Sequence, residues 1–400
     1  MLIEIVLALL IGIIAGTLTG LTPGIHINLL GVLLVSLSAS LFAKIPPIYL
    51  VVFIVAMSIT HTFVDFIPSV FLGCPDSDTS LSVLPGHSLL KKGQGYEAVL
   101  LTVYGSAAAI ILLLFIAWPS IKIMPNIYNS IQSIMPYILI AACATLILFE
   151  QKRFSALFVL LFTGALGLSV LNIPSLNQPL LPLLSGLFGG SMLLISIRTR
   201  TQIPPQIITR PKTKLARPLF GALIASPLCS FLPGLGSSQA AIIGHKTAGI
   251  KSENKGQFLV LLGATNTLVM GFSFLALYAI SKTRTGSASA IQKILTDFSS
   301  HVLILILAIV VLAGTASFFL TTFLAKIFSR VMQRINYTTI SIITLIILSA
   351  VVLAVSGFMG FLVLAVSTFT GLYCISLGVR RTNMMGCLLI PTILFYLFGI

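Results

Sequence analysis

Apolar runs of about 20 residues recur along the whole chain and limit its fold more than any other feature. Residues 99–117, 134–149, 302–324 and 337–355 are four such runs, and each is suited to crossing a bilayer as a helix. Only 8% of the 400 residues are charged, against about 25% in a soluble domain. The sequence therefore predicts an all-α polytopic protein of the cell membrane. A β-barrel would instead show short segments of alternating hydrophobicity.

A basic connector divides the chain into two halves. The net charge is +15, and a group of Lys and Arg residues falls in the Pro-containing stretch 198–217. Basic loops of membrane proteins lie on the cytoplasmic side. We therefore expect a first transmembrane repeat at 1–197, a cytoplasmic connector at 198–217 and a second transmembrane repeat at 218–400. Positive charges that flank membrane helices do not favour nucleic-acid binding.

The two halves carry matching interruptions. Pro233-Gly234 follows Pro23-Gly24 by 210 residues, and at the same offset the polar loop 75–80 falls on the small, polar stretch 285–290. Paired breaks at matching positions are the best sequence pointer to a transporter site. We predict two structural repeats with helices that are broken or re-entrant at the Pro-Gly motifs. By analogy with other transporters, we expect the repeats to be inverted.

Each Pro-Gly break predicts an anion site. Proline removes a backbone donor and glycine permits unusual φ and ψ, so the helix that follows points its N-terminal N–H groups into the break. Side chains near the first break add donors, as do hydroxyls and an amide near the second. Asn266 and the polar stretch 282–290 add further polar groups. A simple kink or a tight hairpin between two ordinary helices is the alternative. The predicted substrate-binding residues are Thr22, Pro23, Gly24, His26, Asn28, Pro233, Gly234, Gly236, Ser237, Ser238, Gln239, Asn266, Arg284 and Ser287.

The scarce acidic residues predict a site for a coupling cation. Three of the eight acids fall between residues 65 and 78, and ionisable groups at bilayer depth are costly and commonly functional. An exposed loop with Asx turns is the alternative for the stretch 72–87, and for Asn266 the alternative is a hydrogen bond between helices. We expect the coupling ion to be Na⁺ or H⁺. The predicted coupling-ion residues are Asp65, Asp76, Ser77, Asp78 and Thr79.

No cofactor is expected. The five cysteines are scattered, with no CxxC pair and no Cys/His cluster of metal-ligand spacing, so they are interpreted as small buried hydrophobic residues. An intramembrane enzyme would need a nucleophile with its base, or paired acids at helical spacing. Asp76 and Asp78 are two residues apart and no His-Glu-x-x-His motif occurs, so catalysis is not predicted.

The motifs resemble those of the permease subunit of tripartite tricarboxylate transporters, the TctA-like proteins. The stretches that carry the resemblance are LTPGIHINLL, CPDSDTSLSVLPGHSLLKKGQGYEA, LPGLGSSQAA, GATNTL and the tail MMGCLLIPTILFYL. The resemblance covers most of the chain. It implies cation-driven import of small carboxylates, together with a small membrane subunit and an extracytoplasmic binding protein.

Two transport functions follow from these features. The first is a secondary transporter of a small organic anion such as a di- or tricarboxylate, held at the two helix N-termini with alternating access. The alternative is a transporter or flippase of an anionic lipid, such as a polyprenyl-phosphate carrier, because hydroxyl-rich breaks in a basic chain suit a phosphate head equally well. Membrane lipids are expected partners in either case.

Overall fold

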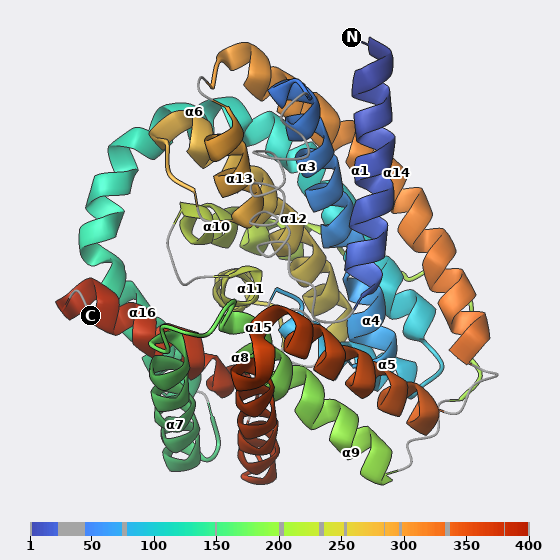
Figure 1. The fold of residues 1–400 in the computed structure, drawn as a ribbon, viewed down its shortest axis with the longest axis vertical. Coiled ribbons are helices and arrows are strands. Elements are labelled where there is room, and N and C mark those ends of the chain that lie inside the picture. Colours follow the sequence, from blue (N-terminus) through green and yellow to red (C-terminus); the bar gives the residue numbers. More distant parts are fainter. Residues whose placement is uncertain are drawn as a thin grey trace.

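The computed structural model describes residues 2–22, 45–73, 78–148, 150–199, 204–231, 236–251, 254–283, 285–295, 298–332, 337–379 and 381–398. Regular structure in these ranges is helical and includes no strand (Figure 1). Within them, nine helical segments are long and apolar enough to cross a membrane. The prediction of an all-α polytopic membrane protein is thus confirmed.

The helices of the two halves are these. The first half contains α1 (Leu2–Leu21), α3 (Pro47–Val64), α4 (Phe66–Phe71), η1 (Ser80–Ser82), α5 (Val83–Leu90), α6 (Gly95–Leu148), α7 (Arg153–Leu171), α8 (Leu180–Leu184), η2 (Ser185–Gly190) and α9 (Ser191–Thr199). The second half contains α10 (Ala216–Phe231), α11 (Ser237–Thr247), α12 (Lys255–Ile280), α13 (Gly286–Ile294), α14 (Ser300–Met332), α15 (Tyr337–Ser376), η3 (Arg381–Met385) and α16 (Gly386–Phe398).

The core lies around α3, α4 and α12. In the apolar windows of α3–α4 and of α12, 94% of the residues are buried, against 11% for α1 and 22% for α15. Gly12, Gly16 and Gly20 line the face of α1 that packs on α3, and a Cβ at any of them would collide with α3. Small residues at this four-residue spacing let two membrane helices approach closely.

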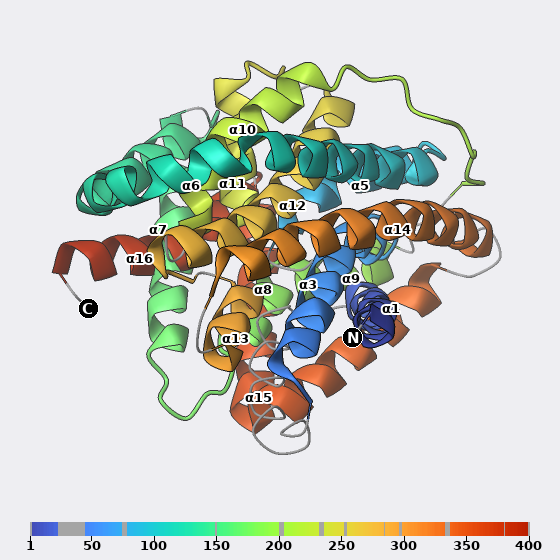
Figure 2. The ribbon, with the colours of Figure 1, turned by 90° about the horizontal axis from the view of Figure 1, so that it is seen from above.

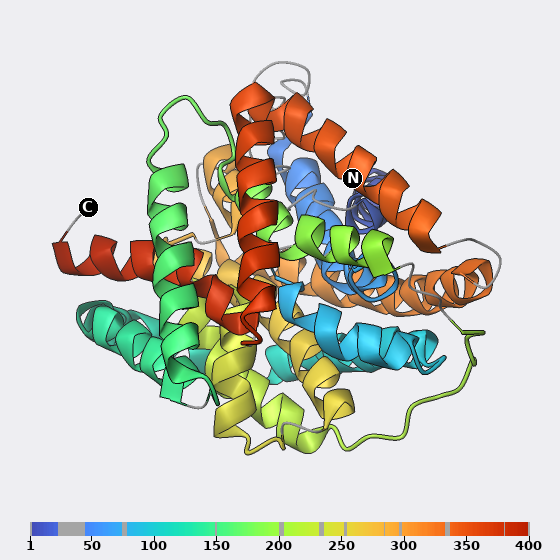
Figure 3. The same ribbon diagram turned by 90° about the horizontal axis from the view of Figure 1, so that it is seen from below.

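Two long helices are bent for identifiable reasons. Pro119, Pro125 and Pro136 lie inside α6, where each removes a backbone donor, and α6 curves around the upper left of the molecule (Figure 1). Gly357 interrupts α15 with φ +66° and ψ −167°, a conformation that favours glycine. The two segments of α15 therefore meet at an angle (Figure 3).

The first half's α3 and α4 pack along the second half's α14. The Ser317 hydroxyl of α14 donates to Oγ1 of Thr60 in α3 at 2.9 Å. Further along both helices, the rings of Phe71 and Phe328 lie 6.0 Å apart. Because both contacts progress in chain order, α3–α4 and α14 run in the same direction.

The reciprocal pair, α6 of the first half and α12 of the second, also run in the same direction. A Cβ at Gly105 of α6 would collide with the carbonyl of Val260, so the two backbones nearly touch there. Further along both helices, Leu113 packs against Gly271. Close contact at glycines is what holds α6 against α12 without a hydrophobic driving force.

The long helices of the two halves cross in opposite directions. Tyr104 of α6 stacks on Phe318 of α14, with ring centroids 6.2 Å apart. Later in α6, Ile110 packs against Gly314, which lies earlier in α14. Since α6 runs with α12 and α14 runs with α3, it follows that α3 and α12 are antiparallel.

Candidate functional site

A row of polar residues follows one face of the most buried helix of the first half. Ser58, Thr62, Asp65 and Ser69 are spaced by four, three and four residues along α3 and α4, which places them on the same side. All four are buried. Asp65 joins α3 to α4 with helical φ and ψ of −60° and −18°, so the face continues through it. The row therefore points polar groups at whatever packs on this face.

Asp65 meets Asn266 of α12 in the interior of the molecule. Nδ2 of Asn266 donates to Oδ2 of Asp65 at 2.9 Å and to the carbonyl of Thr62 at 3.3 Å. The two side chains are 4% and 3% exposed. Asn266 thus makes the hydrogen bonds between helices that one of our two interpretations expected. A carboxylate this deeply buried requires such a donor, since burying a charge without hydrogen bonds is expensive.

The beginning of α11 brings a second carboxylate to the same region. The backbone N–H of Ser237 donates to Oδ1 of Asp78 at 2.9 Å, and the Ser238 hydroxyl donates to the Asp78 carbonyl at 3.1 Å. The carboxylate therefore caps the positive end of α11, where backbone N–H groups lack partners within the helix. This cap comes from the other half of the chain.

One hydroxyl connects the two carboxylates. Oγ of Ser237 donates to Oδ1 of Asn266 at 3.3 Å, while the amide of Asn266 faces Asp65. We call the five residues that these contacts join the central polar network. They are Asp65, Asp78, Ser237, Ser238 and Asn266.

Hydroxyl pairs extend this network in both directions. Oγ of Ser69 lies 2.7 Å from Oγ1 of Thr79, beside Asp78. Oγ1 of Thr62 lies 3.3 Å from Oγ1 of Thr267 in α12. Two turns before Asp65, Oγ of Ser58 lies 2.5 Å from Oγ of Ser287. Ser287 belongs to α13, whose N-terminus is capped by the Thr285 hydroxyl.

The structure brings together part of the predicted site. Asp65, Asp78, Thr79 and the second-half residues Ser237, Ser238 and Asn266 meet at the centre, with Gly236 next to Ser237, whereas Ser287 contacts α3 two turns away. The Thr22 hydroxyl bonds the Leu18 carbonyl of its own helix at 2.7 Å. Gln239 lies in α11, but its side chain is not among the described atoms. The remaining predicted residues lie outside the described ranges: Pro23, Gly24, His26, Asn28, Asp76, Ser77, Pro233, Gly234 and Arg284.

Sequence reasoning missed four participants. Ser58, Thr62, Ser69 and Thr267 look unremarkable one by one, because a serine or threonine within a membrane helix commonly bonds a carbonyl of its own helix. The available signal was their regular spacing with Asp65 along an otherwise apolar segment. A polar row at heptad-like spacing indicates a helix face that contacts other polar groups rather than lipid.

His87 anchors α5 beneath this region. Its Nδ1 lies 2.9 Å from the carbonyl of Val70 in α4, and a Cβ at Gly73 would collide with its Nε2. Burial, together with the nearby Lys91 and Arg381, lowers the pKa of His87 from 6.5 to about 4, against the opposing effect of the hydrogen bond to the Val70 carbonyl. His87 is therefore neutral at neutral pH, with Nδ1–H as the donor.

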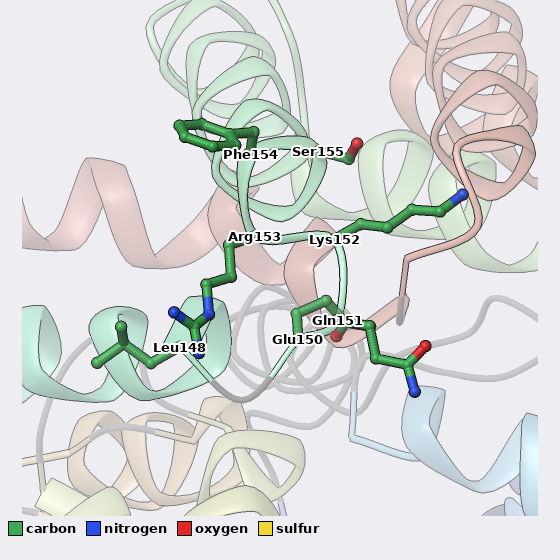
Figure 4. Close-up of a pocket in the computed structure, with 7 residues that line it drawn as sticks. All are labelled: Leu148, Glu150, Gln151, Lys152, Arg153, Phe154 and Ser155. Atoms are coloured by element: carbon green, nitrogen blue, oxygen red, sulfur yellow. The ribbon is translucent and has the colours of Figure 1, made fainter.

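A surface hollow between α6 and α7 is a poor candidate for transport. Its volume is about 720 Å³, and seven residues line it at the end of α6, in the following turn and at the start of α7 (Figure 4). Lys152 and Arg153 point to opposite sides of that turn (Figure 4). Nζ of Lys152 donates to the Leu377 carbonyl at 3.2 Å, and Oε2 of Glu150 accepts from Asn383 at 3.4 Å. These contacts attach the turn to the residue that follows α15 and to η3.

Four of the five cysteines, and the side chains that could bind a metal ion, can be examined within the described ranges. Cys143, Cys229, Cys374 and Cys387 are free thiols and are buried, which confirms the prediction for these four. Within the same ranges, no three His, Cys, Asp or Glu side chains are grouped closely enough to hold a metal ion.

Comparison with known proteins identifies related sequences. The model of the family described as the tripartite tricarboxylate transporter TctA family matches residues 6–386. The uncharacterized protein MJ1079 of Methanocaldococcus jannaschii is 30% identical over 408 residues, an alignment that covers 98% of this chain and 99% of that protein. No solved structure matches. The family match does not favour the anionic-lipid alternative.

Proposed function

Because the chain belongs to the tripartite tricarboxylate transporter TctA family, we propose that it is a secondary permease that moves a small di- or tricarboxylate together with a coupling cation. The family is one of transporters and not of enzymes. The observation that carries the proposal is the central polar network, in which carboxylates of the first half meet an amide and a helix N-terminus of the second half. Substrate held between two halves is what alternating access requires.

The substrate's carboxylate has a natural place at the start of α11. The N–H of Ser237 already binds a carboxylate, that of Asp78, at 2.9 Å. A substrate carboxylate offers the same chemistry to the same donors, and it would displace Asp78. The matching half of the anion site, around His26 and Asn28, remains a prediction.

Displacement of Asp78 would couple the substrate to the cation. Once it leaves the helix N-terminus, the Asp78 carboxylate becomes available to H⁺ or Na⁺, beside the hydroxyl of Thr79. Asp65 is the second cation-binding carboxylate, held by Asn266. Moving one negative charge against a membrane potential costs about 2.3 kcal/mol per 100 mV, so accumulation of a dicarboxylate needs two or more cations. Asp76 and Ser77 remain predicted contributors.

The directions of the helices support inverted repeats. At the offset of 210 residues, the α3 range 47–64 corresponds to 257–274, which lies within α12 (Lys255–Ile280). The two helices are antiparallel, and each packs on the long helix of the opposite half. An inverted pair of repeats places its two broken helices on opposite sides of one central site.

Contacts on the two sides of Asp65 would act as alternating gates. On one side Ser58 of the first half touches Ser287 of the second, and on the other Asp78 touches Ser237. Both contacts are closed in this structure. Rocking of the repeats would open one while the other stays closed. We also propose that transport requires an extracytoplasmic binding protein and a small membrane subunit, as the tripartite family implies.

Uptake into proteoliposomes tests the function. The purified chain is reconstituted with and without its two proposed partners. The vesicles are loaded with unlabelled citrate or succinate, and the labelled anion is added outside. Labelled anion should exchange into the vesicles, and an imposed Na⁺ or pH gradient should drive its accumulation. Asp65→Asn should lose gradient-driven accumulation and keep exchange. No exchange of any di- or tricarboxylate with both partners present would overturn the proposal.

A further inference from the structure

The connector between the halves is pinned to the first half. Gln206 is 6% exposed; its side-chain carbonyl accepts from the N–H of Gly95 at 2.8 Å, and its amide donates to the Leu90 carbonyl at 3.1 Å. The N–H of Ile207 donates to the Gly93 carbonyl at 2.7 Å. A Cβ at Gly93, where φ is +79°, would collide with the connector. The connector is therefore a strap held on the turn between α5 and α6 (Figure 2).

This attachment lies where helices of both halves begin or end. Gly95 sits against the ring of Phe71, which lies 6.0 Å from that of Phe328 near the end of α14. Lys255, the first residue of α12, donates to the Ser88 hydroxyl of α5 at 2.5 Å. We call this part of the molecule, where α4, α5 and α14 end and α6 and α12 begin, the connector end.

Exposed cations gather at the connector end. They come from the strap, from the turn before α6 and from the approach to α12, so both halves contribute. Six of them are Lys91, Lys92, Arg210, Lys212, Lys251 and Lys255. Among the strap's apolar residues, Ile207 is 57% and Ile208 is 40% exposed. Cations beside exposed isoleucines match a bilayer interface, where head groups bind the charges and the apolar side chains enter the acyl boundary.

We infer that the connector end is the cytoplasmic face and that its cations bind the head groups of anionic phospholipids, with the strap lying in the interface. The distribution of charge supports both parts of this proposal. Basic residues mark the cytoplasmic side, and anionic lipids attract cations near the membrane surface. The opposite end, where α12 ends and α13 follows, carries the exposed Lys282 and Lys293. Lipid head groups at the connector end would contact both halves at once.

Lipid retention tests the binding surface. The full chain is purified from a mixed bilayer of phosphatidylglycerol and phosphatidylcholine, and retained lipids are counted by native mass spectrometry. The wild type should retain phosphatidylglycerol preferentially. Lys91→Gln/Lys92→Gln/Lys212→Gln should lose most of that preference, at about fivefold in affinity for each cation.

A matched triple variant removes the same charge elsewhere. Lys122→Gln/Lys282→Gln/Lys293→Gln should keep the wild-type preference, because Lys122 lies 27 residues beyond Gly95 along α6. Equal losses in the two triple variants, or no preference in the wild type, would overturn the lipid surface. Free glycerol phosphate that competes as well as the lipid would also overturn it, because the site would then be one for soluble phosphate.

Labelling tests the orientation. In a background without native cysteines, Lys212→Cys should react with a membrane-impermeant maleimide only after the cells are permeabilised, whereas Lys293→Cys should react in intact cells. The reverse pattern would overturn the cytoplasmic assignment. Neither readout depends on transport, so failure here leaves the carboxylate function to its own test.

Discussion

Asn266 donates from Nδ2 to Oδ2 of Asp65 at 2.9 Å, across 201 residues of sequence and between the two halves of the molecule. The same amide group accepts from the Ser237 hydroxyl through its Oδ1 atom. Asn266 therefore contacts the carboxylate proposed to bind the cation and the helix N-terminus proposed to bind the anion. In the proposed mechanism, a change of occupancy at one site would reach the other through this single side chain.

Asn266→Ala should uncouple the two sites. It leaves the Asp65 carboxylate without its amide donor, which should lower the free energy of unfolding by about 1–3 kcal/mol. The dependence of carboxylate uptake on the cation gradient should weaken with it. Thr265→Val is the matched control, because Thr265 is equally buried in α12 and its hydroxyl donates to carbonyls of its own helix. Unchanged cation dependence in Asn266→Ala would contradict a linking role.

Asp78→Ala should raise the affinity for the substrate. Removing the carboxylate that caps α11 costs about 1 kcal/mol of stability, and the same interaction no longer competes with the substrate. Binding should tighten by about fivefold, measured by calorimetry or scintillation proximity. Glu97→Gln, which neutralises an acid in the first turn of α6, serves as the control. Weaker binding in Asp78→Ala would mean that Asp78 helps to hold the substrate.

Joining Ser58 to Ser287 should stop transport. Their hydroxyl oxygens are 2.5 Å apart and belong to opposite halves, so oxidation of Ser58→Cys/Ser287→Cys would lock one proposed gate closed. Uptake should fall to background and return on reduction, with the disulfide verified by mass spectrometry.

The control for this lock joins two helices of the same half. In Val70→Cys/Gly86→Cys the Cβ atoms would lie 3.5 Å apart, within disulfide range, between α4 and α5. A rigid first half tolerates this bond, so uptake should continue. Full transport by the oxidised Ser58–Ser287 variant would show that the contact does not open.

Acid should destabilise the protein through His87. Its pKa is about 4 in the folded state and 6.5 when exposed, so the unfolded state takes up the proton first. Stability is unaffected above pH 6.5 and falls as the pH drops from 6.5 to about 4, by about 3 kcal/mol at most. His87→Asn removes the titrating group and keeps a donor for the Val70 carbonyl. Thermal midpoints of wild type and variant should converge toward acid pH, and parallel curves would contradict the prediction.

The transmembrane character was predictable because it is a local property. Apolar length and scarce charge determine that a segment is a membrane helix, and α6, α12 and α14 follow from the sequence on that ground. Buried polar residues were also predictable as functional candidates. Asp65 and Asn266 stand out in apolar segments because such groups are expensive at depth.

Their pairing was not predictable, because it depends on helix crossings between segments about 200 residues apart. Nothing near Asp78 in the sequence indicates that it caps α11. Ser58 and Thr62 became informative only once α13 and α12 were seen to face them.

By itself, the sequence determined that this chain forms membrane helices, and which polar groups they carry into the apolar interior. Only the tertiary structure decided which of those groups meet, because helix packing orients whole faces through many weak contacts that no local pattern encodes. The antiparallel arrangement of α3 and α12 is the clearest case. It places Asp65 in contact with Asn266, and Ser58 in contact with Ser287.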